Sequence, residues 1–362
     1  MDQAVYKQLS KIIALALLSG CASQQTNYQN DFSSQAKKPA SRAPASVPLS
    51  QSHSGFSNTA PSMPTTPRYP HHYSALALTG PYANSFALHQ FIQRMVYKHG
   101  FSETYLNGLF SQAQRLDQVI RLENPSPSTG PSKSRVGSWT RYRNKFLTEM
   151  HISNGVQFWL ENADAIAKAS ATYQVDPEYI VGIIGVETYF GRNIGKTCIF
   201  DALTTLAFDT QRRARFFTEE LEHYLLMVRD EGFEPRYPVG SWAGAMGLGQ
   251  FMPSSFRRLA VDFNHDGRRD LWHQHDAIGS VAHYFARSGW HYNSPVAQQT
   301  SNTHGSGIID LSTYQGNEYW RVFPNFKVIK SYNNSNKYAM AVHQLAQAIK
   351  QRYVRIAYND RY

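Results

Sequence analysis

The stretch Val181-Gly-Ile-Ile-Gly-Val-Glu-Thr-Tyr-Phe-Gly-Arg192 decides how this 362-residue chain folds and which chemistry it carries. It follows Asp176-Pro177-Glu178, which predicts a helix start with Asp as N-cap and Pro at the first helical position. Counting onward, Ile180, Ile183 and Glu187 share one helix face. A carboxylate that ends an apolar stripe loses hydration, and its pKa rises toward that of a general acid near neutral pH.

The spacing alone also allows a structural role for Glu187. The carboxylate could sit at the rim of the stripe, or it could pair with Arg192. A second carboxylate for glycosidase-type chemistry would have to be one such as Asp201 or Asp209, and both are more simply read as capping residues of short helices.

Helical periodicity extends outward from this stretch and predicts a mainly α fold. The best strand candidate is 326–330, which alternates apolar and polar residues. No apolar run reaches the ~20 residues of a membrane-spanning helix. The predicted helices are 86–96, one that starts with Ser102 as N-cap, 153–173, 177–190, 213–229, 253–263, 277–288 and 337–353.

The segment 262–267, Asp-Phe-Asn-His-Asp-Gly, matches the first half of an EF-hand calcium loop. Its Gly267 permits the sharp turn, but His273 stands at position 12, where a bidentate Glu is usual. Asp270 is not counted as a ligand, and an Asp/Asn-rich turn without metal is the alternative. The expected calcium ligands are Asp262, Asn264, Asp266, the carbonyl of Arg268, and Asp276, which would close a lengthened loop.

A glycine-rich loop, 240–253, lies between the helix and the calcium-type loop. Its glycines let backbone approach closely, and Pro253 starts the next helix. Because no Lys-Ser/Thr follows the glycines, the loop is not a P-loop. A sugar-binding loop that presents backbone groups and Gln250 fits better.

The N-terminus has the pattern of an export signal, with Lys7 and Lys11 ahead of an apolar stretch. Leu18-Ser19-Gly20-Cys21 resembles a bacterial lipobox, so residues 1–20 are expected to be removed and Cys21 acylated. Ala22 favours sorting to the outer membrane of a Gram-negative bacterium, facing the periplasm. Residues 21–74, rich in Ser, Gln and Pro, are expected to form a flexible tether.

Composition narrows the function classes. With 36 basic and 26 acidic residues, the net charge of +10 favours an anionic polymer or membrane surface as partner. Two cysteines exclude a disulfide scaffold. Once Cys21 is acylated, Cys198 is the remaining thiol, and its apolar context predicts a buried small hydrophobe rather than a nucleophile.

The stretch 181–192, together with Ser241-Trp-Ala-Gly-Ala-Met-Gly-Leu-Gly-Gln-Phe-Met-Pro-Ser-Ser255, resembles the membrane-bound lytic murein transglycosylase B family, glycoside hydrolase family 103. The calcium-type loop resembles that family's EF-hand-like site. The resemblance covers roughly 88–349 and implies a lysozyme-like catalytic core over 75–362, with a calcium-loop subdomain at about 230–300.

The resemblance also implies the reaction. Such enzymes cleave the β-1,4 bond between N-acetylmuramic acid and N-acetylglucosamine without water and leave 1,6-anhydromuramic ends. Glu187 would act first as acid and then as base. The resemblance further implies a structural calcium ion, peptidoglycan as the partner and no nucleic acid. It also implies a monomer that could join a wall-remodelling complex.

Further positions carry over from the family one at a time. Arg212 and Arg213 match a basic pair suited to the substrate's carboxylates, and Phe216 departs from the family's usual tyrosine, which removes a hydrogen bond. The remaining implied contacts near the sugar are Ser241, Gln250, Tyr142, Tyr284, Asn333 and Tyr338.

Three alternatives remain at this point: a hydrolytic muramidase with a second carboxylate, a wall-binding lipoprotein without activity, and a basic nucleic-acid binder. The retained Glu187 opposes the second. The export signal and the lack of a clustered Lys/Arg helix oppose the third.

Overall fold

The computed structural model describes residues 72–125 and 135–359. The predicted signal peptide, Cys21 and nearly all of the tether lie outside them. The helices are η1 (Gly80–Tyr82), α2 (Phe86–His99), α3 (Glu103–Ser111), α4 (Asp117–Glu123), α5 (Ser138–Arg143), α6 (Glu149–Glu161), α7 (Ala163–Tyr173), α8 (Pro177–Thr188), α9 (Ile199–Phe208), α10 (Ala214–Glu231), α11 (Pro253–Leu259), α12 (Gln274–Arg287), α13 (Pro324–Tyr332) and α14 (Asn336–Asn359).

The strands form two small antiparallel sheets. A two-residue ladder pairs β1 (Thr197–Cys198) with β2 (Val239–Gly240). The second sheet has the order β3-β5-β4, with β3 (Ala297–Thr300) and β4 (Ile308–Thr313) on either side of β5 (Gly316–Val322).

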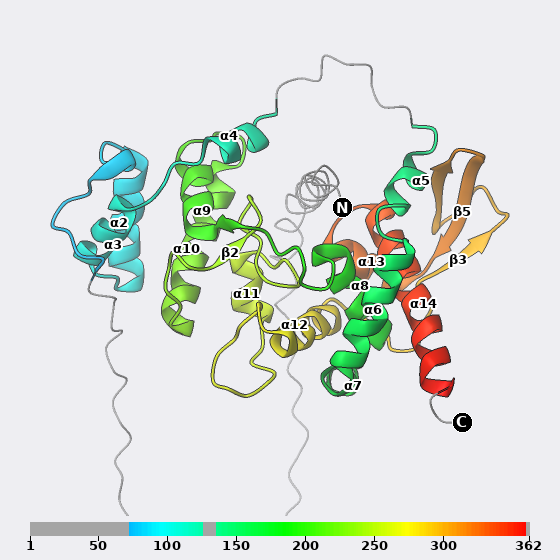
Figure 1. Cartoon of the computed structure of the whole chain (residues 1–362). Helices are drawn as coiled ribbons and strands as arrows, with labels where there is room; N and C mark the ends of the chain where they lie inside the picture. The colour runs from blue at the N-terminus through cyan, green and yellow to red at the C-terminus, as the bar shows by residue number, and fades with distance from the viewer. Residues whose placement is uncertain (1–71, 126–134, 360–362) are drawn as a thin grey trace, which may run out of the picture.

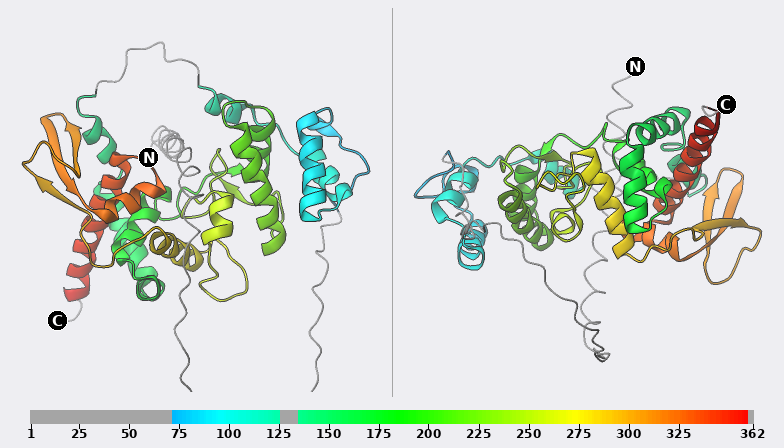
Figure 2. Two further views of the ribbon diagram at one scale, coloured as in Figure 1. Left: turned by 180° about the vertical axis from the view of Figure 1, so that it is seen from behind. Right: turned by 90° about the horizontal axis from the view of Figure 1, so that it is seen from below.

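The elements are arranged in a row (Figures 1 and 2). Helices α2 and α3 stand at one end, and the three-stranded sheet stands at the other. Helices α9 and α10 pack together beside α2 and α3, while α8 packs against α14, α6, α7 and α12. The catalytic candidate Glu187 therefore ends a helix that other helices surround.

Side-chain caps explain several helix starts. Ser85, Ser102 and Thr148 each accept a hydrogen bond from the backbone N–H three residues on. Gly100 and Gly232 end α2 and α10 in the left-handed conformation, where a side chain would be strained. The predicted N-cap at Ser102 is confirmed.

Helix α8 is buried all round rather than on one face. Every residue from Glu178 to Thr188 is buried, whereas the sequence predicted an apolar stripe. Asp176 precedes the helix as predicted but does not cap it with its side chain. Its carboxylate instead accepts hydrogen bonds from the Trp290 indole N–H, at 2.8 Å, and from the Asn293 backbone.

The structure corrects two further expectations. Residues 326–330 lie in helix α13, which begins at Pro324, and are not a strand. The predicted helix 153–173 is two helices, α6 and α7, separated at Asn162. Near the predicted start of the folded body, Tyr73 is buried and donates a hydrogen bond to Glu234.

Within 72–125 and 135–359, no helix has both the length and the apolar character needed to cross a bilayer.

Candidate active site

Glu187 lies in the last turn of α8 and is buried, with 3% of its surface exposed. Burial raises its pKa to about 7, and a hydrogen bond from Tyr338 opposes that rise. The Tyr338 hydroxyl donates to Glu187 Oε1 at 2.5 Å. Arg192 lies over the ring of Tyr189. A carboxyl with this pKa is partly protonated at neutral pH, as a general acid requires.

Tyrosines from three segments respond to the charge of this carboxyl. Burial raises the pKa values of Tyr142, Tyr332 and Tyr338, and the charge of Glu187 adds to each rise. Tyr332 donates to the Gly249 carbonyl, and Tyr284 packs beside Tyr332 at 4.6 Å between ring centroids. The site is therefore lined by weakly acidic hydroxyls that stay protonated.

The backbone turns sharply directly after Glu187. Tyr189 and Phe190 have positive φ angles of 54° and 60°, and Gly191 follows at 81°. Thr188 fastens this turn, because its hydroxyl donates to the Leu248 carbonyl at 2.9 Å and accepts from the Gly191 N–H at 3.0 Å. The turn thereby joins the end of α8 to the glycine-rich loop.

The glycine-rich loop 240–253 is held by its own polar residues. The Ser241 hydroxyl accepts hydrogen bonds from the backbone N–H groups of residues 243 and 245. Gln250 is buried, has a φ of 52°, and donates through Nε2 to the carbonyls of Gly247 and Ile194. Gly247 has a φ of 65°, and a Cβ there would meet the Leu271 carbonyl at 2.3 Å. These contacts fix the loop beside the turn that follows Glu187.

Two more expected contacts lie around the junction of α13 and α14. Tyr284 donates to the Ser331 carbonyl at 2.8 Å, and Asn333 is buried directly after Tyr332. Among the expected sugar contacts, Tyr338 contacts Glu187 directly, Tyr142 feels its charge, and Tyr284 packs against Tyr332.

Arg212 and Arg213 are engaged by a carboxylate of the chain itself. Glu123, at the end of α4, is fully buried and accepts from the Nε atoms of Arg213, at 3.0 Å, and Arg212, at 3.2 Å. Arg213 also donates to Oε2, so it binds Glu123 with two nitrogens. Burial alone would raise the pKa of Glu123, but these hydrogen bonds outweigh it and the pKa is lowered.

The two aspartates considered as second carboxylates are used elsewhere. Asp201 lies in the first turn of α9 and accepts from the Gln114 backbone N–H and from Arg236. Asp209 ends the same helix and accepts from the Tyr82 hydroxyl at 2.7 Å. Both therefore tie α9 to neighbouring segments.

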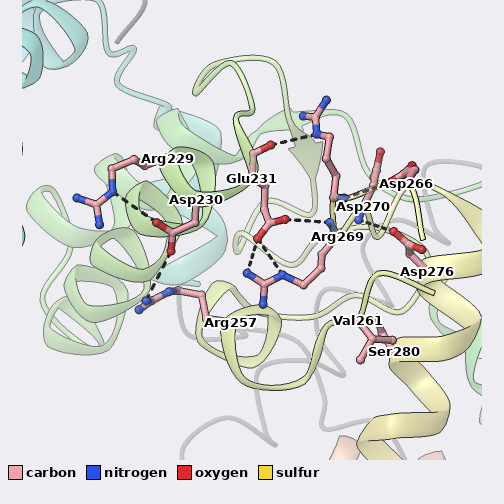
Figure 3. A network of polar contacts seen from close by, with 11 residues as sticks. Arg229, Asp230, Glu231, Arg257, Val261, Asp266, Arg269, Asp270, Asp276 and Ser280 are labelled. Atoms are coloured by element: carbon pink, nitrogen blue, oxygen red, sulfur yellow. Dashed lines mark hydrogen bonds and ion pairs between the residues drawn. The ribbon is translucent and has the colours of Figure 1, made fainter. Parts of the chain in front are cut away.

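The calcium-type loop is wrapped around its own side-chain oxygens. Asp262 and Asn264 both accept from the Asp266 backbone N–H at 3.1 Å, and Asp262 also accepts from Gly267. The loop is anchored to the end of α10, since Arg269 donates to the Glu231 carboxylate (Figure 3). Within the described residues, no three His, Cys, Asp or Glu side chains are arranged to hold a metal ion.

Asp276 shapes this loop from within. It lies in the first turn of α12, is fully buried, and accepts from the backbone N–H groups of Phe263, Asn264 and Asp270 at 2.8–3.2 Å. Figure 3 shows it facing Asp270. Both of its oxygens serve the backbone, which distinguishes it from the exposed Asp266.

Residues 84–347 match the transglycosylase SLT domain. The chain is 45% identical over 311 residues to the membrane-bound lytic murein transglycosylase B of Escherichia coli strain K12, a match that covers 76% of this chain and 86% of that protein. The chain belongs to the transglycosylase SLT family. The resemblance stated from the sequence is confirmed, and the chain is an enzyme, a lytic murein transglycosylase.

Solved structures place this transglycosylase in the same fold. The Escherichia coli lytic transglycosylase SLT35 in complex with bulgecin A matches with a TM-score of 0.71 at 44% identity, over 77% of this chain and 97% of that one. SLT35 in complex with calcium matches equally well at 43% identity. SltB3 from Pseudomonas aeruginosa in complex with NAG-NAM-pentapeptide matches at 0.63 and 25% identity, over 73% of this chain and 79% of that one. The predicted mainly α class is confirmed.

Three contacts around the candidate site were not predicted from the sequence. Tyr332 reaches Gly249, Glu123 binds the arginine pair, and His151 donates through Nε2 to the Gly185 carbonyl near the end of α8. None belongs to a local motif, because each partner is distant in sequence.

Cys198 is half-buried rather than fully buried. Its thiol donates to the Arg236 carbonyl at 3.3 Å, and burial raises its pKa to about 11. A thiol with so high a pKa is a poor nucleophile, in agreement with the sequence interpretation.

Proposed function

We propose that Glu187 is the single acid and base with which this enzyme converts peptidoglycan to 1,6-anhydro products. The observation that carries the proposal is one buried carboxyl, with a pKa of about 7, hydrogen-bonded to Tyr338. The membership of the chain in the transglycosylase SLT family supports it.

The first step is protonation of the leaving group. Glu187 transfers its proton to the glycosidic oxygen as the bond from that oxygen to C1 of the muramic acid breaks. The positive charge that develops at the sugar is met by the new carboxylate. The Tyr338 hydroxyl donates to that carboxylate and so stabilises its charged form.

The second step uses the sugar's own nucleophile. The C6 hydroxyl attacks C1, and the Glu187 carboxylate takes its proton, which restores the acid. One bond to C1 forms, one breaks, and no water is consumed. Because the nucleophile belongs to the same ring, proximity replaces an activated water and no second carboxylate is needed.

The products decide between this reaction and hydrolysis. Muropeptides released from peptidoglycan by the full chain in detergent are expected to be one water lighter than reducing muropeptides when weighed by mass spectrometry. Reducing ends would instead mean a hydrolase with a second carboxylate. Asp201 accepts hydrogen bonds from Gln114 and Arg236, and Asp209 accepts one from Tyr82. Because these bonds occupy both candidate second carboxylates, they support the non-hydrolytic reaction.

The polar residues around Glu187 are proposed to contact the sugars. Tyr142 and Tyr284 would line the site, and Tyr338 would bridge acid and substrate. The other proposed contacts are Ser241, Gln250, Asn333 and the half-exposed Arg212. Recognition of peptidoglycan is supported by the relative SltB3, whose structure contains NAG-NAM-pentapeptide.

We also propose that the loop 262–268 holds a structural calcium ion. The side-chain oxygens of Asp262 and Asn264 share the Asp266 backbone N–H as donor, and Asp266 Oδ1 accepts from the Arg268 N–H in the same loop. Oxygen ligands suit this cation. The carbonyl of Arg268 would complete the set. Asp276 was expected to close the loop as a ligand, but because both of its oxygens accept from backbone N–H groups, we assign it to shaping the loop instead. That SLT35 of Escherichia coli has been solved with calcium supports the assignment.

Chelation tests the calcium proposal. Because the loop is separate from Glu187, removing calcium with EGTA is expected to lower the melting temperature, with activity lost only in proportion to unfolding. Differential scanning calorimetry with and without calcium measures this. Activity that fell at an unchanged melting temperature would contradict a purely structural role.

The N-terminal segment is proposed to anchor the enzyme to the periplasmic face of the outer membrane. The lipobox-like 18–21 tetrad supports this, as does the name of the membrane-bound relative. Labelled palmitate is expected to enter the full chain and to be absent from Cys21→Ser. Equal labelling of both would place the lipid elsewhere.

A further inference from the structure

An exposed tyrosine stands on the tip of the β4–β5 hairpin. Tyr314 is 61% exposed and occupies the two-residue turn between Thr313 and Gly316. The Thr313 hydroxyl fixes this turn by donating to the Gly316 carbonyl at 2.7 Å and accepting from the Gln315 N–H at 3.1 Å. The aromatic ring is thus presented by a defined turn.

The hairpin tip is built against the helix that carries Tyr142. The Gly137 N–H, at the start of α5, donates to the Thr313 carbonyl at 3.1 Å. A Cβ at Gly137 would lie 2.2 Å from the Tyr314 ring, so the ring rests directly on this backbone. The Arg141 guanidinium lies 5.8 Å from the ring centroid. Figure 1 shows α5 beside the sheet.

Tyr142 sits on the same short helix, and ring contacts connect it through Phe146 and His151 to Tyr189, the second residue after Glu187. The five steps from Gly137 to Tyr142 rise roughly 8 Å along the helix axis at ~1.5 Å per residue. That distance is comparable with the length of a disaccharide. A glycan strand that leaves the site along α5 would therefore meet the hairpin tip.

We propose that Tyr314 and Arg141 form an outer subsite for the glycan strand. The open face of the ring would stack on the apolar face of a sugar, and the guanidinium would meet a carboxylate of the stem peptide. This proposal rests on the proposed function. It gives the small sheet a role in binding long substrates.

Strand length provides the test. For the full chain in detergent, KM is measured on purified glycan strands of increasing length. Tyr314→Ser is expected to raise KM for long strands about five- to tenfold, with kcat unchanged and KM for the shortest substrate unaffected. Tyr314→Phe keeps the ring and is expected to behave as the unmodified chain. Tyr97→Ser, which removes a 95% exposed tyrosine at the opposite end of the row, is the matched control.

Each possible result either supports the outer subsite or contradicts it. A KM defect that grows with strand length in Tyr314→Ser alone supports the subsite. Unchanged KM on long strands, an equal loss on short substrates, or an equal loss in Tyr314→Phe overturns it. Failure of the unmodified chain to release any product would count against the proposed function instead, and direct binding of long strands then tests the subsite by the same variants.

Discussion

Glu187→Gln is expected to abolish peptidoglycan turnover while the protein stays folded. Gln matches Glu in size and can still accept the hydrogen bond from Tyr338, but it has no proton to give and cannot take one back. Since one group serves both steps of the proposed mechanism, the rate should fall by roughly three orders of magnitude or more. Mass spectrometry of the released muropeptides measures the loss.

The same variant is expected to be more stable than the unmodified chain at pH 8. Burial raises the pKa of Glu187 from 4.5 to about 7, so the folded state holds a proton that the unfolded state has lost. The stability of the unmodified chain therefore falls between pH 4.5 and 7 and levels off above that range, by about 1–3 kcal/mol. Gln does not titrate. The melting temperatures of Glu187→Gln and the unmodified chain should therefore be similar at pH 5, whereas at pH 8 the variant should melt at a higher temperature.

Tyr338→Phe separates the acid from its partner. In the proposed mechanism activity needs protonated Glu187, so it is expected to decline as the pH rises through about 7. Because the Tyr338 hydrogen bond lowers this pKa, its removal should move the alkaline limb of the pH–rate profile to higher pH. An unmoved limb, or anhydro products from a folded Glu187→Gln, would transfer the acid role to another residue.

Sequence periodicity was sufficient for the helical part of the fold. The 3.6-residue pattern and Ser102 as N-cap located helices that the structure confirms. The prediction failed where a strand-like and a helix-like pattern overlap. Residues 326–330 alternate as a strand would, yet Pro324 gives them a helix start and Phe326 and Ile329 one buried face.

The small sheet escaped prediction for a physical reason. Strands are recognised by a buried face, and in β4 only Leu311 is buried. The other residues of β4 are held by backbone pairing with β5, and backbone hydrogen bonds do not require any particular side chains. Glu187 was found because the apolar residues that precede it in α8 form one continuous segment. Tyr332 and Glu123 were missed because they act across more than 80 residues.

Glu123→Ala is expected to destabilise the enzyme by about 3 kcal/mol. The carboxylate is fully buried, and Arg213, which it binds with both oxygens, is 16% exposed, so deletion leaves a guanidinium with little water to replace its partner. Arg212 is 54% exposed and contributes little to this cost. The melting temperature should fall by roughly 6–12 °C.

Glu219→Ala provides the matched control. Glu219 pairs with Arg215 on the surface of α10, where both side chains meet water, and its loss should cost no more than about 0.5 kcal/mol. The pH dependence adds a second check. Arginine contacts lower the pKa of Glu123, so its contribution is present above the unfolded pKa near 4.5 and disappears as the pH falls through the folded value.

The Glu123→Ala experiment also tells whether Arg212 and Arg213 have different roles. The family resemblance assigns both arginines to substrate carboxylates, but the structure commits Arg213 to Glu123 and leaves much of Arg212 in water. If Arg213 is a positioning residue, Glu123→Ala lowers stability, and Arg212→Ala raises KM without that loss. If Glu123→Ala instead kept its melting temperature and bound peptidoglycan more tightly, Arg213 would be a substrate-binding residue. Glu123 would then compete with the substrate for a pair whose main partner is the peptidoglycan.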